Sequence, residues 1–279
     1  MRGRSPLRSS YRAVVAAGLI VTAGCSHRRA PTTQVTPVVA PAGVTRDEID
    51  KLWIQAMGLY RQGKWGKSAT VFERVMLELP AGDSLGPQAH FRLGECYFAQ
   101  KSQLQAAREF RKVSDDTPNA SLAPEALLRA GDAYGDLWRR PELDDTYGQT
   151  ARSTYQELLN RYPDAPAAAR ARLRISELEE FFARKEYKTA QYYFRLRAYD
   201  SAILYLKDLA ATYPRARVTP EALLKLVGAY RAVGYPEDLQ ETCGYIRRFH
   251  PTTPGLDAAC PAPADSSPPT PPASPAGSH

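Results

Sequence analysis

One ending recurs five times along the chain: an amphipathic segment runs into a proline. The prolines lie roughly 40–50 residues apart, within the range of periods found in repeat architectures, and they are Pro80, Pro118, Pro163, Pro214 and Pro251. Twelve residues before each proline stands a residue that is small in four of the five cases, in order Ser68, Ala106, Ala151, Ala202 and Leu239. Because proline cannot continue a helix, each of these endings marks the end of one.

A second element precedes each ending, with a small residue followed three positions later by an aromatic one. Gly94 with Tyr97 and Gly131 with Tyr134 are the clearest pairs. Small residues let two antiparallel helices approach, and the aromatic side chains fill the space between neighbouring hairpins. The combined pattern resembles the tetratricopeptide repeat. It predicts an all-α fold, a tetratricopeptide-repeat solenoid of about five helical hairpins over residues 45–251.

Two repeats are longer than the others. The surplus in the third falls between its two helices, around residues 141–148. The surplus in the fourth precedes its hairpin, in a stretch that has no glycine and only an initial proline. This predicts one extended first helix, from about Pro166 to Arg195.

The segment QYYFRLRAYDSA, residues 191–202, interleaves aromatic side chains with arginines. Such a mixture is typical of surfaces that stack nucleic-acid bases. However, Tyr193, Tyr199 and Ala202 occupy repeat-packing positions, which leaves Arg195 and Arg197 as solvated neighbours near the turn. The segment is therefore predicted to be mainly the inside of a helical hairpin, and no nucleic-acid partner is expected.

Residues 1–24 have the pattern of a secretory signal. Four arginines precede the uncharged run Ala13–Val21, which is too short to span a membrane as a helix. Part of the net charge of +7 therefore belongs to the export signal, and this weakens any argument from charge for nucleic-acid binding.

The run VTAGC that follows resembles a bacterial lipobox. It departs from the usual pattern at Thr22, where an aliphatic residue is common. The resemblance implies that Cys25 is lipidated, with palmitate among its acyl groups, and becomes the mature N-terminus. Ser26, in place of aspartate, implies passage to the outer membrane, where the anchored chain would face the periplasm. The alternative is an ordinary signal peptide with an incidental cysteine.

Low-complexity segments flank the repeats. Residues 25–44 are rich in Pro, Thr and Ala and are predicted to be a flexible tether. Residues 252–279 are rich in Pro, Ser and Ala, which predicts a disordered tail. Apart from Cys25 the chain has three cysteines, and this odd number predicts no disulfide framework. Cys96 and Cys243 are interpreted as small core residues, and Cys260 as part of the tail.

No catalytic or metal-binding pattern is complete. Gly58, Gly63 and Lys64 have the spacing of a phosphate-binding loop, but Trp65 occupies the position of the magnesium-binding Ser or Thr, and no strand precedes them. The four histidines show no metal-ligand spacing. We therefore expect no enzyme activity, no cofactor and no metal.

Five repeats behind a lipobox, with an insert in the third and a long helix before the fourth, resemble the BamD family. The closest local likeness runs from Arg172 to Pro214. The resemblance implies a scaffold of the machinery that assembles β-barrel proteins in the outer membrane. Its implied partners are the barrel subunit, accessory lipoproteins, unfolded outer-membrane proteins and, through the anchor, the membrane. The alternatives are another periplasmic repeat lipoprotein for pilus assembly or cell-envelope division, a cell-wall lytic enzyme and a nucleic-acid binder.

The repeat register also predicts a binding groove. Concave positions of the first helices are filled by large side chains in the first two repeats: Trp53, Met57, Tyr60, Phe91 and Phe98. The functional interpretation is a groove for an extended, aromatic-ended segment of a β-barrel substrate, as the resemblance implies. The alternative is that these side chains pack against the tether or against each other.

Overall fold

The computed structural model describes residues 44–261. The expected signal peptide, Cys25 and all but the last residue of the expected tether lie outside the described residues, as do residues 262–279. Within residues 44–261 every regular element is a helix, and these are α1 (Arg46–Arg61), α2 (Trp65–Glu78), α3 (Gly86–Ala99), α4 (Gln103–Asp116), α5 (Ala123–Gly135), α6 (Thr146–Arg161), α7 (Pro166–Arg195), α8 (Tyr199–Thr212), α9 (Thr219–Val233), α10 (Pro236–Phe249) and α11 (Leu256–Ala259).

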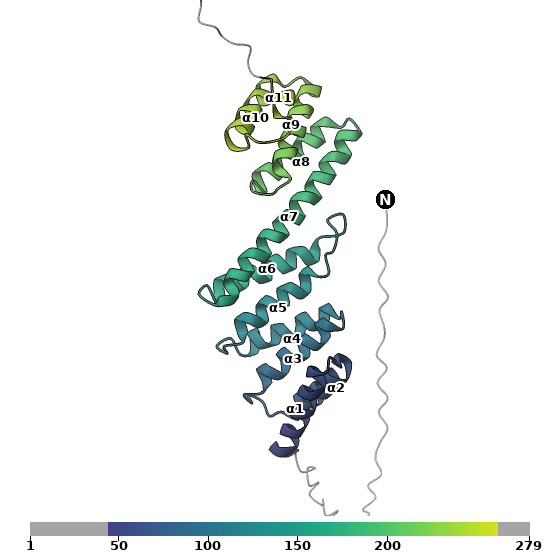
Figure 1. Ribbon diagram of the computed structural model, residues 1–279, viewed down its shortest axis with the longest axis vertical. Helices are drawn as coiled ribbons and strands as arrows, with labels where there is room; N and C mark the ends of the chain where they lie inside the picture. Colours follow the sequence, from purple (N-terminus) through teal and green to yellow (C-terminus); the bar gives the residue numbers. More distant parts are fainter. Residues whose placement is uncertain (1–43, 262–279) are drawn as a thin grey trace, which may run out of the picture. The chain divides into compact units, whose positions relative to one another are not determined.

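The first ten helices form five successive hairpins, and each helix packs against the next (Figure 1). This confirms the all-α tetratricopeptide-repeat solenoid. The turns inside four of the hairpins each contain a residue with positive φ: Gly63, Lys101, Arg197 and Gly234. A left-handed residue lets the chain reverse within very few positions, and glycine adopts that conformation without the steric cost that a Cβ brings.

Close contact between the paired helices depends on the small residues of the motif. A Cβ at Gly131 of α5 would lie 2.3 Å from the ring of Tyr155 on α6, far inside contact distance. Gly94 of α3 is covered in the same way by Phe110 of α4. These two aromatic rings are buried because the facing position has no side chain.

The helix α7 confirms the extended element expected from Pro166 to Arg195. Its first half packs on α5 and α6, where Ala167, Ala168 and Ala171 are buried. Its second half packs on α8 and α9 through Tyr187 and Ala190. One continuous helix therefore belongs to two hydrophobic clusters and joins them.

The aromatic segment at the end of α7 is mainly interior, as predicted. Tyr193 stacks on Tyr205 of α8 with ring centroids 5.3 Å apart, and Ala202 is fully buried. Arg195 and Arg197 are exposed. Both arginines are thus on the outside, and of the four rings of the segment only Tyr192 is exposed.

The C-terminal boundary differs from the prediction. The expected disordered tail begins at residue 252, but residues 256–259 form α11, and Cys260 makes a disulfide with Cys243 of α10. The prediction of no disulfide is therefore wrong, and so is the assignment of Cys260 to a disordered segment. Cys243 is buried, as expected of a core residue, but it is covalently bonded as well.

Candidate interaction site

A pocket of about 420 Å³ lies across the first helices of three consecutive hairpins. Residues of α3, α5 and α7 contribute to it, together with one residue of α6 and two of the loop that precedes α6. The lining residues are Phe98, Arg129, Asp132, Gly135, Asp136, Trp138, Tyr155, Arg174, Glu177, Leu178 and Phe181. The site therefore exists only when the three hairpins are stacked.

Asp132 organises the polar side of the pocket. Its carboxylate accepts hydrogen bonds from the Tyr155 hydroxyl at 2.9 Å and from Nε of Arg174 at 3.1 Å. It also pairs with Arg129 at 3.3 Å. Burial, followed by the charge of Asp132, raises the pKa of the Tyr155 phenol, so the phenol stays protonated and remains a donor. These contacts fix both guanidinium groups at the pocket wall.

Aromatic rings form the apolar side. The guanidinium carbon of Arg129 lies 4.4 Å from the centre of the Phe98 ring, in the geometry of a cation–π contact. Trp138, from the loop before α6, packs on Phe182 and Phe181 of α7 with centroids 4.6 and 5.6 Å apart. Its indole Nε1 is buried and has no hydrogen-bond acceptor among the described residues. The pocket thus combines ring faces with fixed donors.

Gly135 explains why there is room for a pocket at this place. It lies four residues after Gly131, just as Phe98 lies four residues after Gly94, so the two positions are equivalent in the repeat. Where α3 presents a phenyl ring, α5 presents no side chain. The space that a second ring would fill remains open beside Phe98.

The five predicted groove residues are divided between two hydrophobic clusters. Trp53 packs edge-on against Phe72, with centroids 5.4 Å apart, inside the first hairpin. Tyr60 packs edge-on against Trp65, and its hydroxyl donates to Glu95 at 2.9 Å. Met57 is half-buried in the same cluster. In the described residues these three side chains therefore pack within and between the first two hairpins.

Phe91 and Phe98 belong to one hydrophobic cluster, but they differ in exposure. Phe91 is only 7% exposed and lies against Phe110, with ring centroids 5.3 Å apart. This contradicts its assignment to an open groove, because a ligand could reach the ring only by displacing core side chains. Phe98 is the one predicted residue that lines the 420 Å³ pocket.

The repeat register of the sequence predicts only part of the rest of the pocket. Arg129 and Asp132 on α5 and Arg174 on α7 lie on the corresponding first helices. Continuing the register from Gly131 places Asp132 and Gly135 on concave positions of α5, whereas Arg129 does not fall on one and Arg174 lies in the part of α7 that precedes the fourth repeat. Trp138 lies in the loop between α5 and α6, which no repeat register covers.

No group of three or more potential ligands that could hold a metal ion occurs in residues 44–261. Across the same residues, no helix combines the length and apolarity needed to cross a bilayer. Stacked hairpins whose pocket offers rings, guanidinium groups and hydrogen-bond donors define a tetratricopeptide-repeat scaffold, a non-catalytic class of protein.

Comparison with known proteins identifies the family. Residues 46–243 match the family model described as YfiO, outer membrane lipoprotein. A relative from Vibrio cholerae, named outer membrane protein assembly factor BamD, is 29% identical over 229 residues, which cover 78% of this chain and 90% of the relative. The protein of that name from Neisseria meningitidis serogroup A is 23% identical, with 78% and 85% covered. The chain therefore belongs to the BamD (YfiO) family of outer membrane lipoproteins.

Among solved structures, the chain is similar to the tetratricopeptide-repeat domain of P58(IPK), with 14% identity and a TM-score of 0.42. The match covers 74% of this chain and 52% of that one.

Proposed function

We propose that this protein is a periplasm-facing lipoprotein scaffold of the outer-membrane β-barrel assembly machinery. It binds the barrel subunit, accessory lipoproteins and incoming unfolded barrel proteins, and it catalyses no reaction. The observation that carries the proposal is the family match over residues 46–243, whose curated relatives are named outer membrane protein assembly factors. The disulfide supports export, because disulfides persist in oxidising compartments such as the periplasm.

The pocket between α3, α5 and α7 is the proposed site for an unfolded substrate segment. Its volume falls within the range of small-ligand sites, roughly 300–1,000 Å³, so it suits one or two side chains of an extended peptide rather than a folded domain. An aromatic side chain of the segment would stack beside Phe98. The Arg129 guanidinium would interact with peptide carbonyls or with a terminal carboxylate.

Titration of a peptide from the C-terminus of an outer-membrane β-barrel protein tests this site. We expect Phe98→Ala to weaken binding by about thirtyfold, since removing an aromatic anchor at a binding hot spot costs about 2 kcal/mol. Leu104→Ala is the matched control, because Leu104 is an exposed large side chain on the other helix of the same hairpin. Equal affinities of the two variants, at equal thermal stability, would exclude the pocket.

Lipid anchoring and the barrel partner need separate tests. Cys25→Ala should abolish labelling by a fatty-acid analogue and release the protein from the membrane. The variant loses the proposed attachment point of the acyl chains, and stable anchoring needs more than one such chain. Affinity purification of the wild-type chain from membranes should co-elute the barrel subunit. If that subunit is missing while lipid labelling is present, the chain is a lipoprotein of another assembly.

A further inference from the structure

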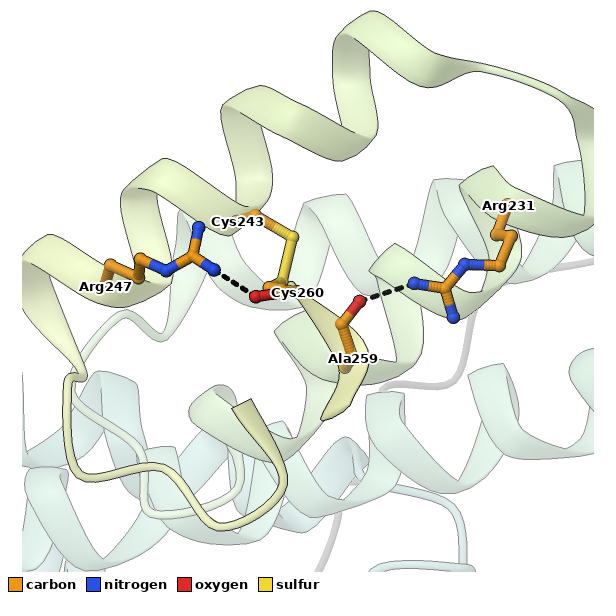
Figure 2. The surroundings of a disulfide bond; sticks show 5 residues. All are labelled: Arg231, Cys243, Arg247, Ala259 and Cys260. Atoms are coloured by element: carbon orange, nitrogen blue, oxygen red, sulfur yellow. Dashed lines mark hydrogen bonds between the residues drawn. A yellow bond between two sulfur atoms is a disulfide. The ribbon is translucent and has the colours of Figure 1, made fainter. Parts of the chain in front are cut away.

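The last segment that the structure describes folds back on the end of the repeat stack. After α10 ends at Phe249, the backbone N–H and the hydroxyl of Thr253 both donate to the carbonyl of His250. Gly255, with φ +83°, then turns the chain into α11. These contacts bring Cys260 to Cys243, with Cα atoms 5.6 Å apart (Figure 2).

The segment buries little surface of its own but belongs to the core. Leu256 is 6% exposed and Cys260 is 1% exposed. Both join the cluster that contains Tyr230 of α9 and Ile246 of α10. A single helical turn is not stable by itself, because the cost of nucleating a helix exceeds what one turn of hydrogen bonds returns. One leucine and one turn do not suffice to hold residues 251–260 in place.

Two arginines complete the attachment. Arg231 of α9 donates to the carbonyl of Ala259, and Arg247 of α10 donates to the carbonyl of Cys260 (Figure 2). The last carbonyls of a helix have no partner within the helix, and cationic side chains are favourable at that end. The arginines therefore come from both helices of the last hairpin and fix the end of α11 between them.

We propose that the Cys243–Cys260 disulfide is an oxidation-dependent clasp that docks α11 on the last hairpin, in place of the longer capping helix that a repeat stack otherwise needs. Terminal repeats require a cover because one face has no neighbour to bury it. With both cysteines reduced, residues 251–261 detach, and the cluster around Tyr230 and Ile246 is uncovered at that end. The clasp thus makes completion of the fold depend on the redox state of the compartment.

The chemistry is thiol–disulfide exchange with a disulfide donor, for which oxidised glutathione is the probe. One cysteine thiolate attacks the donor, forms a mixed disulfide and releases one glutathione thiolate. The second cysteine thiolate then attacks the protein sulfur and displaces the other glutathione. The two cysteines lose two protons and two electrons in total, and one oxidised glutathione becomes two reduced molecules.

Hydrogen exchange measured by mass spectrometry tests the clasp on the full chain. Wild-type protein with glutathione in its oxidised form is compared with the Cys243→Ser/Cys260→Ser double variant. We expect amides in residues 256–260 to exchange at least about tenfold faster in the double variant, because local opening controls their protection. Protection of α3–α6 should be the same in both proteins. The same protection of residues 256–260 in both would overturn the proposal.

Three further measurements keep the test independent of folding defects in the double variant. Reduced wild-type protein, before glutathione is added, should show the fast exchange of the double variant, and oxidation should restore slow exchange. Cys96→Ser, which also removes a thiol, should respond to oxidation as wild type does, because Cys96 is unbonded. If alkylation of the oxidised, denatured protein labels Cys243 and Cys260, the disulfide does not form and the proposal is wrong.

Discussion

The two halves of the repeat stack, α1–α6 and α8–α11, use the same hairpin but are held together differently. Ion pairs between side chains are numerous in the first half and in α7, for example between Arg111 and Glu157 at 3.0 Å. Among the described residues, no ion pair involves a side chain beyond Lys188. The second half combines apolar burial with one disulfide and with hydrogen bonds from arginines to backbone carbonyls.

The residue at the small position of the repeat motif also varies along the stack. In the second and third hairpins it is glycine, with a ring of the partner helix directly on it. In the fourth hairpin it is Ala190, which is fully buried. The same repeat pattern therefore allows two kinds of packing. Either an aromatic ring lies on the backbone of a glycine, or the methyl group of an alanine packs against neighbouring side chains. The helix α7 must fit both, since it contacts each half.

The largest expected effect comes from interrupting α7. Ser176 is exposed in the middle of this helix, so Ser176→Pro changes little except the backbone. We expect a loss of about 3 kcal/mol or more, because proline removes a hydrogen bond and clashes with the preceding turn. Denaturant unfolding followed separately by probes in each half should give two transitions instead of one.

Ser176→Ala is the control for that variant, and it should unfold in a single transition. If Ser176→Pro also unfolds as one unit with an unchanged midpoint, the two halves are coupled by something other than a continuous α7.

Exchanging the small residues between the halves should have a smaller effect. Gly131→Ala places a methyl group against the Tyr155 ring, and we expect it to destabilise the protein by about 1–3 kcal/mol. The reverse exchange, Ala190→Gly, should cost only about 0.5–1 kcal/mol through the greater freedom of glycine in the unfolded chain. Thermal unfolding of both variants measures the difference. A cost for Ala190→Gly equal to or above that of Gly131→Ala would contradict the distinction.

The hairpin turns should respond alike in both halves. Lys101 has φ +65° and Arg197 has φ +59°, and each makes the turn of its hairpin. Replacing either with glycine should stabilise the protein by about 1 kcal/mol, because a Cβ in the left-handed region is strained. Chemical denaturation of Lys101→Gly and Arg197→Gly gives the values. If either change destabilises the protein instead, the lysine or arginine side chain stabilises the fold by more than the strain of its left-handed backbone costs.

The smallest effect is a decline of stability at alkaline pH that involves both halves. Burial raises the pKa of Tyr155 and of Tyr187, and the neighbouring acceptors Asp132 and Glu221 add to the shift. A raised pKa means that the folded state holds the proton more tightly. The stabilisation is therefore complete below the unfolded-state pKa of about 10 and is lost as the pH rises above it.

Melting temperatures measured from pH 8 to pH 11 test this expectation. Tyr155→Phe, in the first half, and Tyr187→Phe, in the part of α7 that packs on the second half, should each flatten the alkaline decline. A decline that is unchanged in the double variant would assign the pH dependence to other groups.

Features that act within one or two helices, or that recur in the repeats, could be predicted from the sequence. Features that depend on one residue or one long-range contact could not. The prolines and the small–aromatic pairs predicted the hairpins, because each acts within one or two helices. The length of α7 was predictable because its sequence has no residue that ends a helix. The register placed Phe91 on a concave position, but it could not show that Phe110 covers the ring. That covering depends on Gly94, which lets the helices approach.

The pocket and the disulfide depend on single residues that break the pattern. The pocket needs the missing side chain at Gly135 and a tryptophan supplied by the loop before α6. The disulfide joins a helix to a segment whose composition suggests disorder, and an odd cysteine count gives no pairing. In each case the decisive contact is between positions that the repeat does not relate.

The burial of Cys96 limits its competition for Cys243 and Cys260 when the disulfide forms. Cys96 is fully buried in α3, and burial raises the pKa of its thiol. Since only the thiolate attacks a disulfide, Cys96 is a poor competitor once its hairpin has folded. Its hairpin also lies well before Cys243 and Cys260 in the chain, so it can fold before the last cysteine is available. Folding of the second repeat thus favours the bond between Cys243 and Cys260 over a bond of either cysteine with Cys96.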